Sequence, residues 1–411
     1  MARGERSRLL CDPEEGDVKV REYRYLVVGG GMTADAACKA IRQHDPDGAI
    51  GLVSREAHPP YERPPLTKAL WKGGSEDSIW RATGDAGVDL ELGRRIVSLD
   101  LAVGRATDDT GQVYGYERLL LATGGAPRRF SFPADGVVYY RTLDDYRRVR
   151  ELAADGARFV VVGGGFIGSE IAAALAMNGA RVTMVFPDDG IGARIFPPEL
   201  SAFVADYYQS QGVEVLAGES VEAIEGNGPV RVVLGSGRAL DADAVVAGLG
   251  IAPATELAAE AGLPVDDGIV VDQFGRVGGR DDVFAAGDVA RFPIPTLGGH
   301  ARVEHEDHAL SHGARVGANM AGADEPYHHL PFFYSDLFDL GYEAVGDVDA
   351  RNETLVEWVE PMRKGVVCYL DGDRRPRGFL LWDVWGRVDA ARELIRAGEP
   401  VRPETLQGLL A

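Results

Sequence analysis

The stretch YLVVGGGMTA (residues 25–34) decides how this chain begins to fold. Its first four residues are typical of a short buried strand, and the residues after the glycines follow a helical pattern to about His44. The glycines fit the pattern G-x-G-x-x-A. Its first glycine allows a tight turn, its second lets the backbone approach a pyrophosphate, and its small last residue lets helix and strand pack closely. We therefore predict a dinucleotide-binding unit, in which Glu56 is placed to hydrogen-bond a ribose.

The same arrangement returns in RFVVVGGGFIG (residues 158–168), a full G-x-G-x-x-G between a predicted strand and a helix that runs to Asn178. Two such units in one chain indicate two nucleotide-binding folds. The next predicted strand ends shortly before Asp188, whose carboxylate suits the free 2′-hydroxyl of NADH. Arg194 lies close by and could accept the 2′-phosphate of NADPH, so NADH is favoured while NADPH stays open.

Two shorter signals indicate a flavin. LLLATGG (residues 119–125) reads as a strand ending in an Ala-Thr-Gly turn, and DDVFAAGD (residues 281–288) reads as a strand that ends in Gly-Asp. In open α/β sheets, ligands bind at the carboxyl ends of strands. Because these two turns flank the second glycine motif, we expect one non-covalently bound FAD together with NADH as the second cofactor.

The predicted fold class is α/β, with two Rossmann-type three-layer nucleotide-binding domains and a C-terminal α+β domain. A chain of 411 residues is too long for one compact core. We expect a disordered lead-in (1–22), a discontinuous FAD-binding domain (23–144 and 268–325) and an NADH-binding domain (145–267). The composition becomes rich in aromatic residues from Pro326 onward, which indicates a third domain (326–411).

The composition excludes several functions. A net charge of −21 argues against nucleic acid as a partner, because phosphate binding needs clustered cations. No apolar run is long enough for a membrane span, and no apolar leader follows Met1, so we expect a cytoplasmic protein. The three cysteines, Cys11, Cys38 and Cys368, include no CxxC pair.

No spacing of histidine, cysteine and carboxylate residues predicts a metal site. Four histidines in the second part of the predicted FAD-binding domain (268–325) are best read as exposed residues of a helix. They are His300, His305, His308 and His312.

Together these motifs resemble the flavoprotein reductases of the glutathione reductase superfamily, and the missing cysteine pair excludes the disulfide reductases within it. YERPPLTK (residues 61–68) resembles a segment shared by class I ferredoxin reductases and apoptosis-inducing factor. RVEHEDHA (302–309), YSDL (334–337) and GYEAVG (341–346) resemble apoptosis-inducing factor more closely. The chain departs from that family at Tyr334, where tryptophan is usual.

The resemblance implies a set of site residues. The expected FAD contacts are Gly29, Gly30, Gly31, Met32, Thr33, Glu56, Arg63, Lys68, Thr123, Gly124, Arg128, Asp288, His305 and Glu306. The expected NADH contacts are Gly164, Gly165, Phe166, Ile167, Asp188, Arg194, Gly250, Glu304, Tyr334 and Glu343. The resemblance also implies that Lys68 and Glu170 form an ion pair beside the flavin N5. Phe166 is expected to cover the flavin until the nicotinamide displaces it.

The chemistry implied is hydride transfer from NADH to the flavin N5, followed by electron transfer to an acceptor. One hypothesis is an oxidoreductase similar to apoptosis-inducing factor, with a quinone or another acceptor. A second is an NADH:ferredoxin or rubredoxin reductase, which a basic patch of Arg291, Arg302 and Arg315 near the flavin edge would favour. A third is a redox-sensing binding module that forms a homodimer when NADH reduces it.

Overall fold

The computed structural model describes residues 20–226 and 229–410. Strand β1 (Arg21–Val28) already begins at Arg21, so the predicted disordered lead-in is wrong at its last two residues. Arg21 and Glu22 pair with Tyr114 and Gly115 of a distant strand, and such long-range pairing leaves no mark in local polarity. Residues 1–19 of the predicted lead-in lie outside the described residues.

The first sheet is mostly parallel and contains the first glycine turn. Its order is β3 (Val88–Leu92), β2 (Ile50–Ser54), β1, β6 (Val113–Leu121), β5 (Arg105–Asp108) and β4 (Ile96–Asp100). A late strand, β18 (Val283–Ala285), joins this sheet alongside β6. Because β18 runs parallel to β1 and β6, Asp288 lies at the same sheet edge as the glycine turn between β1 and α1 (Met32–His44).

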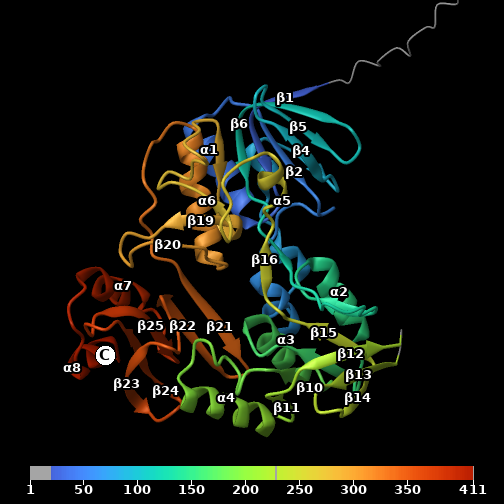
Figure 1. The fold of residues 1–411 in the computed structure, drawn as a ribbon, viewed down its shortest axis with the longest axis vertical. Helices are drawn as coiled ribbons and strands as arrows, with labels where there is room; N and C mark the ends of the chain where they lie inside the picture. Colours follow the sequence, from blue (N-terminus) through green and yellow to red (C-terminus); the bar gives the residue numbers. More distant parts are fainter. Residues whose placement is uncertain (1–19, 227–228, 411) are drawn as a thin grey trace, which may run out of the picture.

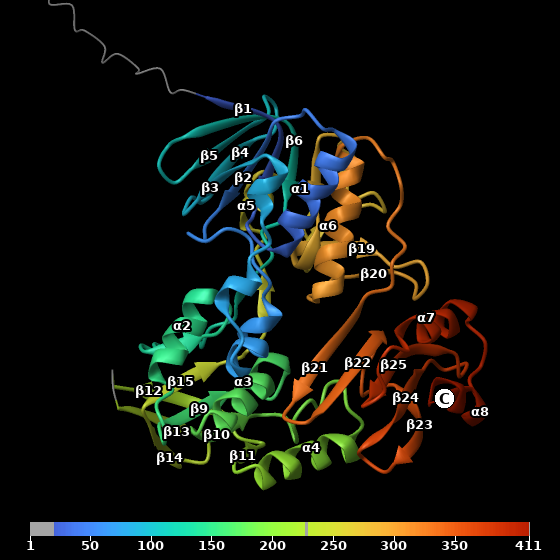
Figure 2. The ribbon, with the colours of Figure 1, turned by 180° about the vertical axis from the view of Figure 1, so that it is seen from behind.

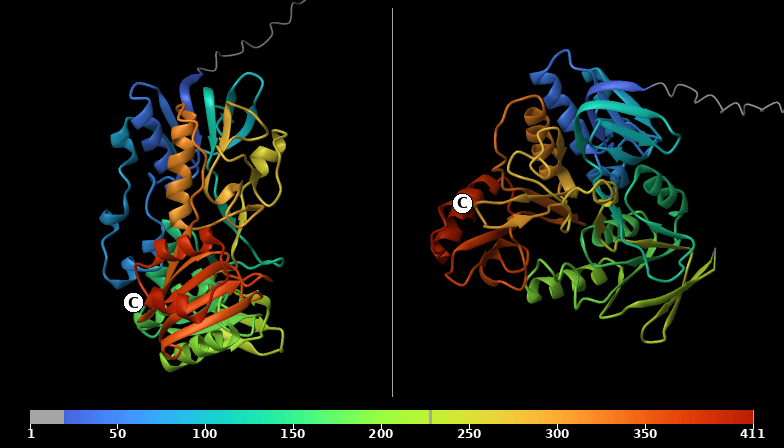
Figure 3. Two further views of the ribbon diagram at one scale, coloured as in Figure 1. Left: turned by 90° about the vertical axis from the view of Figure 1, so that its left-hand side faces the viewer. Right: turned by 45° about the horizontal axis from the view of Figure 1, so that its top comes forward.

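Helix α6 (Glu306–Met320) packs against α1 over this sheet (Figures 1 and 3). The two helices approach closely because α6 carries glycine where it meets α1. A Cβ atom at Gly313 would lie 2.5 Å from the Thr33 carbonyl oxygen, and one at Gly317 would lie 2.4 Å from the Ala37 carbonyl oxygen. This close contact fixes the start of α6, with Glu306, near the first glycine turn.

The histidines of α6 correct the sequence analysis. His308 and His312 are buried, not exposed, and lie one helical turn apart against the Phe292 ring. His308 Nδ1 bonds the Tyr327 hydroxyl at 3.1 Å, and His312 Nδ1 accepts from the Gly287 N–H at 3.3 Å. The sequence shows that the two share a helix face but not that this face turns inward.

The second sheet is wholly parallel and contains the second glycine turn. Its order is β11 (Glu214–Ala217), β10 (Arg181–Phe186), β9 (Arg158–Val162), β15 (Ala244–Ala247) and β8 (Val137–Tyr139). The helices of this unit are α2 (Leu143–Leu152), α3 (Phe166–Met177) and α4 (Pro198–Ser210). An antiparallel sheet of β12 (Val221–Glu225), β13 (Val230–Leu234) and β14 (Ala239–Ala242) follows β11 in the chain.

Two crossing segments join the nucleotide-binding units. Strands β7 (Gly125–Pro127) and β16 (Ile251–Pro253) pair antiparallel where the chain leaves the first unit and returns to it. A second connection comes from residues 64–72, which contain the 3₁₀ helices η1 (Pro64–Leu66) and η2 (Ala69–Lys72). Figure 2 shows this segment descending from the first sheet toward α3.

The C-terminal sheet is antiparallel. Its order is β21 (Phe332–Leu337), β22 (Leu340–Gly346), β25 (Pro376–Trp382), β24 (Lys364–Leu370) and β23 (Glu353–Glu360). Alternate residues face opposite ways, so Phe379 packs in one core with residues of α7 (Val388–Ala397) and α8 (Pro403–Leu410), while Trp382 stacks on Tyr342 in another.

The shorter elements complete the described chain. They are η3 (Glu76–Ile79), η4 (Thr83–Ala86), α5 (Glu256–Glu260), β17 (Ile269–Val270), η5 (Gly287–Val289), β19 (Ala290–Pro293) and β20 (His300–Ala301). Among residues 20–226 and 229–410, no helix combines the length and the apolar character that crossing a membrane requires. The predicted fold class is confirmed, while the domain boundaries drawn from the sequence stay a prediction.

Candidate active site

A single cavity of about 930 Å³ runs from the glycine turn before α1 to the glycine turn before α3. The structure brings nearly all of the predicted site residues to its wall. Those on the FAD side are Gly29, Gly30, Gly31, Met32, Thr33, Glu56, Arg63, Lys68, Thr123, Gly124, Asp288, His305 and Glu306. Those on the NADH side are Gly164, Gly165, Phe166, Ile167, Glu170, Asp188, Arg194, Gly250, Glu304 and Tyr334.

Each glycine turn has the shape that a pyrophosphate needs. Gly29 and Gly163 take positive φ angles of 132° and 120°, and a Cβ atom there would lie 2.1 Å and 2.3 Å from backbone oxygens. In contrast, a Cβ atom at Gly31 or Gly165 would meet nothing within 4 Å. These two glycines cap α1 and α3 and face the open cavity, where unpaired N–H groups at a helix start favour an anion. The residues present therefore fit two dinucleotides.

Lys68 and Glu170 form the predicted ion pair, with side chains only 11% and 5% exposed. Glu170 lies in the first turns of α3, and Lys68 follows η1. Two hydroxyls that the sequence analysis missed also donate to this carboxylate, Thr67 Oγ1 at 2.5 Å and Ser335 Oγ at 2.6 Å. Glu170 thus connects the first unit, the second unit and the C-terminal sheet at one buried point.

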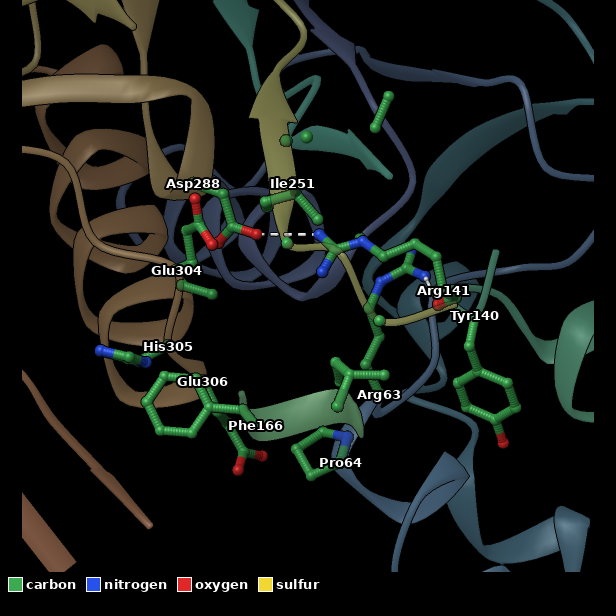
Figure 4. Close-up of a pocket in the computed structure, with 18 of the residues that line it drawn as sticks. Arg63, Pro64, Tyr140, Arg141, Phe166, Ile251, Asp288, Glu304, His305 and Glu306 are labelled. Atoms are coloured by element: carbon green, nitrogen blue, oxygen red, sulfur yellow. Dashed lines mark hydrogen bonds and ion pairs between the residues drawn. The ribbon is translucent and has the colours of Figure 1, made fainter. Parts of the chain in front are cut away.

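An aromatic wall stands beside this ion pair. The His305 ring stacks on Phe333 at 4.2 Å, and Phe166 meets Phe333 edge-on at 5.1 Å. Burial lowers the pKa of His305 to about 4, so its imidazole is neutral at pH 7. Phe166 is 38% exposed, which is unusual for a large apolar side chain, because it projects into the cavity (Figure 4). This placement suits a residue that covers a planar ring.

The opposite side of the pocket holds an arginine cluster (Figure 4). Arg63 pairs with Glu56 at 2.5 Å and donates to the Arg141 carbonyl oxygen at 2.9 Å. Burial opposes ionisation of Glu56, but Arg63 and a hydrogen bond from the Tyr61 hydroxyl outweigh it and lower the pKa of Glu56. Arg141 also pairs with Asp288 at 2.9 Å. The two arginines thus orient Glu56 and Asp288, two carboxylates that are predicted to contact FAD.

Two predicted residues do not reach the cavity wall. The Arg128 side chain is exposed, and only its backbone N–H is engaged, donating to the Gly250 carbonyl oxygen at 2.9 Å. Glu343 instead accepts from the Gly386 N–H at 2.9 Å. Arg141, which we did not predict, does line the cavity. The sequence feature that could have identified Arg141 is its position between strand β8 and the capping box that Thr142 forms at the start of α2.

The three arginines proposed as a docking patch do not form a free basic surface. Each contacts a carboxylate: Arg291 pairs with Asp266, Arg302 with Glu304, and Arg315 with Glu325. A neutralised patch gives little electrostatic attraction to an acidic partner protein. Across the part of the chain that the structure describes, no group of three or more histidine, cysteine and acidic side chains is arranged to hold a metal ion.

Comparisons with known proteins agree with this geometry. Residues 23–313 match the family described as pyridine nucleotide-disulphide oxidoreductase, and residues 316–362 match the C-terminal domain of mitochondrion-associated apoptosis-inducing factor. The chain is 32% identical to mitochondrial apoptosis-inducing factor 1 of Dictyostelium discoideum, over 93% of this chain and 79% of that protein.

Two further relatives are reductases of electron-transfer systems. The chain is 35% identical to the ferredoxin–NAD(+) reductase component of the anthranilate 1,2-dioxygenase system of Burkholderia cepacia, over 93% of this chain and 96% of that protein. Its fold is similar to that in the crystal structure of the covalent putidaredoxin reductase–putidaredoxin complex. The TM-score is 0.87 and the identity 28%, over 93% of this chain and 95% of that one.

Proposed function

Since this chain belongs to the pyridine nucleotide-disulphide oxidoreductase family and is an FAD-dependent NADH oxidoreductase, we propose that it passes the electrons of NADH to a small quinone-type acceptor. The observation that carries the proposal is the single cavity shared by the two glycine turns. FAD, when bound, supplies a ring that accepts a hydride from NADH and passes the electrons on. Once the nicotinamide has left, an acceptor ring of similar size can pack against the aromatic wall of His305, Phe333 and Phe166.

The site residues have distinct proposed roles. Lys68 places a positive charge beside the flavin, and Glu170 keeps that charge oriented. Phe166 covers the ring face and moves aside for the nicotinamide or the acceptor. Asp288 holds the ribityl chain of FAD, and Arg141 orients Asp288.

The choice of acceptor is tested by steady-state kinetics. With NADH and a 1,4-naphthoquinone, we expect parallel double-reciprocal lines, because both substrates use the same cavity in turn. Turnover with a purified ferredoxin, read through cytochrome c reduction, is expected to be much slower. Negligible quinone turnover beside rapid ferredoxin turnover would contradict the proposal.

A ferredoxin-type protein is the second candidate acceptor. The names of two relatives favour it, since one is a ferredoxin–NAD(+) reductase component and the other is a reductase solved with putidaredoxin. The paired state of Arg291, Arg302 and Arg315 and the net charge of −21 weigh against an acidic protein partner. Dimerisation driven by NADH stays a prediction.

Asp188 is expected to set the preference for NADH over NADPH. It lines the cavity just after β10, and within the described residues its carboxylate takes part in none of the hydrogen bonds or ion pairs of the structure, so it is available for the ribose 2′-hydroxyl. Its charge repels a 2′-phosphate. Asp188→Ala should therefore narrow the ratio of kcat/KM for NADH over NADPH by about 10-fold or more, since loss of a hydrogen bond to a charged group is worth roughly 1.5–3 kcal/mol.

The matched control is Asp189→Ala, because Asp189 is the exposed neighbour and does not line the cavity. A wild-type ratio near one, or an Asp188→Ala ratio equal to that of the wild type, would show that Arg194 controls the ribose pocket instead.

A further inference from the structure

Glu306 is the first residue of α6 and lies on the cavity wall close to Phe166 (Figure 4). The Tyr334 hydroxyl donates to Glu306 Oε2 at 3.3 Å. Lys68 Nζ lies 5.2 Å from the centre of the Tyr334 ring, so Tyr334 stands between Glu306 and the buried ion pair of Lys68 and Glu170. A carboxylate, a phenol and the predicted flavin N5 position thus follow one another along the cavity.

Glu306 is available for proton transfer, whereas most other carboxylates of the cavity are committed. Glu170 accepts from three side chains, and Glu56 and Asp288 pair with arginines. None of the ion pairs among the described residues includes Glu306. Its known partner is a neutral hydroxyl, which can both donate and accept, whereas the tryptophan usual at this position in the resembling family could only donate.

The surroundings of Glu306 favour its protonated form. Burial raises its pKa, and the carboxylate of Glu62 adds to this effect, while the hydrogen bond from Tyr334 and the charges of Arg81 and Lys68 oppose it. Burial also raises the pKa of Tyr334, so its hydroxyl keeps its proton at neutral pH. A glutamate in this position holds a proton at a pH at which an exposed glutamate has lost it.

Reduction of a quinone needs such a proton. The reaction is NADH + H⁺ + quinone → NAD⁺ + hydroquinone, in which NADH supplies two electrons and one proton by way of the flavin. The second proton needs a donor, and the Phe166 and Phe333 side chains of the aromatic wall cannot supply one. We propose that Glu306, acting through the Tyr334 hydroxyl, delivers this second proton to the oxygen of a quinone-type acceptor. The inference rests on the proposed function.

In this step the O–H bond of Glu306 breaks as its proton moves to the Tyr334 oxygen. The Tyr334 hydroxyl passes its own proton to the quinone oxygen, where a new O–H bond forms. Glu306, which is only partly buried, then regains a proton from water. No further oxidant or reductant is needed, since the electrons come from NADH.

The test compares two acceptors on the holoenzyme. A naphthoquinone requires the proton, whereas ferricyanide takes one electron at a time and no proton. Glu306→Gln and Tyr334→Phe are each expected to lower the ratio of quinone turnover to ferricyanide turnover by about 100-fold, within the usual range for a general acid. Tyr334→Trp should behave like Tyr334→Phe. Asp189→Asn, which removes an exposed carboxylate that does not line the cavity, is the control and should keep the wild-type ratio.

The pH profile provides a second readout. Wild-type quinone turnover should fall as pH rises through the raised pKa of Glu306, and the profile should be flat in Glu306→Gln. If both variants kept the wild-type ratio, or if quinone and ferricyanide turnover fell in parallel, Glu306 would have only a structural role and the inference would be wrong. If the wild-type protein reduced ferricyanide but not the quinone, the proposed acceptor itself would be wrong.

Discussion

Replacing Lys68 with alanine is expected to slow the reduction of bound flavin by NADH about 100-fold or more. Lys68 is the cation of a nearly buried ion pair on the cavity wall, where negative charge develops as the flavin accepts a hydride. Loss of one preorganised electrostatic group in such a site typically costs a factor of 10² to 10³ in rate. Stopped-flow measurement of the flavin absorbance after mixing with NADH gives this rate directly, and the flavin potential should fall as well.

The same substitution leaves the Glu170 carboxylate without its cation. Removal of one member of a buried ion pair commonly costs about 3–5 kcal/mol. Here Thr67 and Ser335 still donate to Glu170, so we expect the loss of stability to lie near the lower end of that range. FAD retention should change less than the rate does, because the first glycine turn and the arginine cluster remain intact.

Lys72→Ala is the matched control for Lys68. Lys72 lies four residues further along, its side chain is 48% exposed, and it pairs with Asp336 at 3.3 Å. Exposed ion pairs contribute little to stability, and Lys72 does not line the cavity. Equal rates and potentials for both variants and the wild type would show that Lys68 only supports the structure.

The second large effect is expected from a matched pair of glycine substitutions, Gly31→Ala and Gly165→Ala. In both cases the new methyl group meets no protein atom within 4 Å and projects into the cavity. Gly31→Ala should lower FAD affinity at least 100-fold, so that the protein is purified largely colourless. Gly165→Ala should retain FAD but raise the KM for NADH by a similar factor.

The two variants distinguish the two sites, because Gly31→Ala should lose affinity for FAD and Gly165→Ala should lose affinity for NADH. Flavin released by acid precipitation measures the first loss, and steady-state kinetics measures the second. Gly408→Ala, at an exposed position in α8, should leave both quantities unchanged. If Gly31→Ala kept its FAD while Gly165→Ala lost it, the assignment of the two turns would have to be reversed.

The sequence predicted best those elements that local patterns define. Strands β9 and β10 and helix α3 lie where apolar runs and the glycine turn placed them. The strand predicted before the Ala-Thr-Gly turn was less accurate, because β6 already begins at Val113. The first half of β6 pairs with β5 and with the start of β1, and this tertiary pairing overrides the local signal.

The site shows the same division. The glycine turns were predicted from sequence motifs, and the ion pair of Lys68 and Glu170 was predicted from the family resemblance. Ser335 and Arg141 were missed, because each is a single polar residue whose position depends on how separate units pack. The buried His308 was misread for the same reason, since only the packing of α6 shows which helix face turns inward.

The central claim is that NADH, held at the second glycine turn, reduces FAD held at the first within one shared cavity. Anaerobic titration of the purified protein with NADH tests this most directly. We predict a yellow protein that releases FAD on acid precipitation, and whose flavin absorbance is lost as NADH is added, reaching its end point at one equivalent per chain. A reconstituted protein that holds no flavin, or a bound flavin that NADH leaves oxidised, would contradict the account.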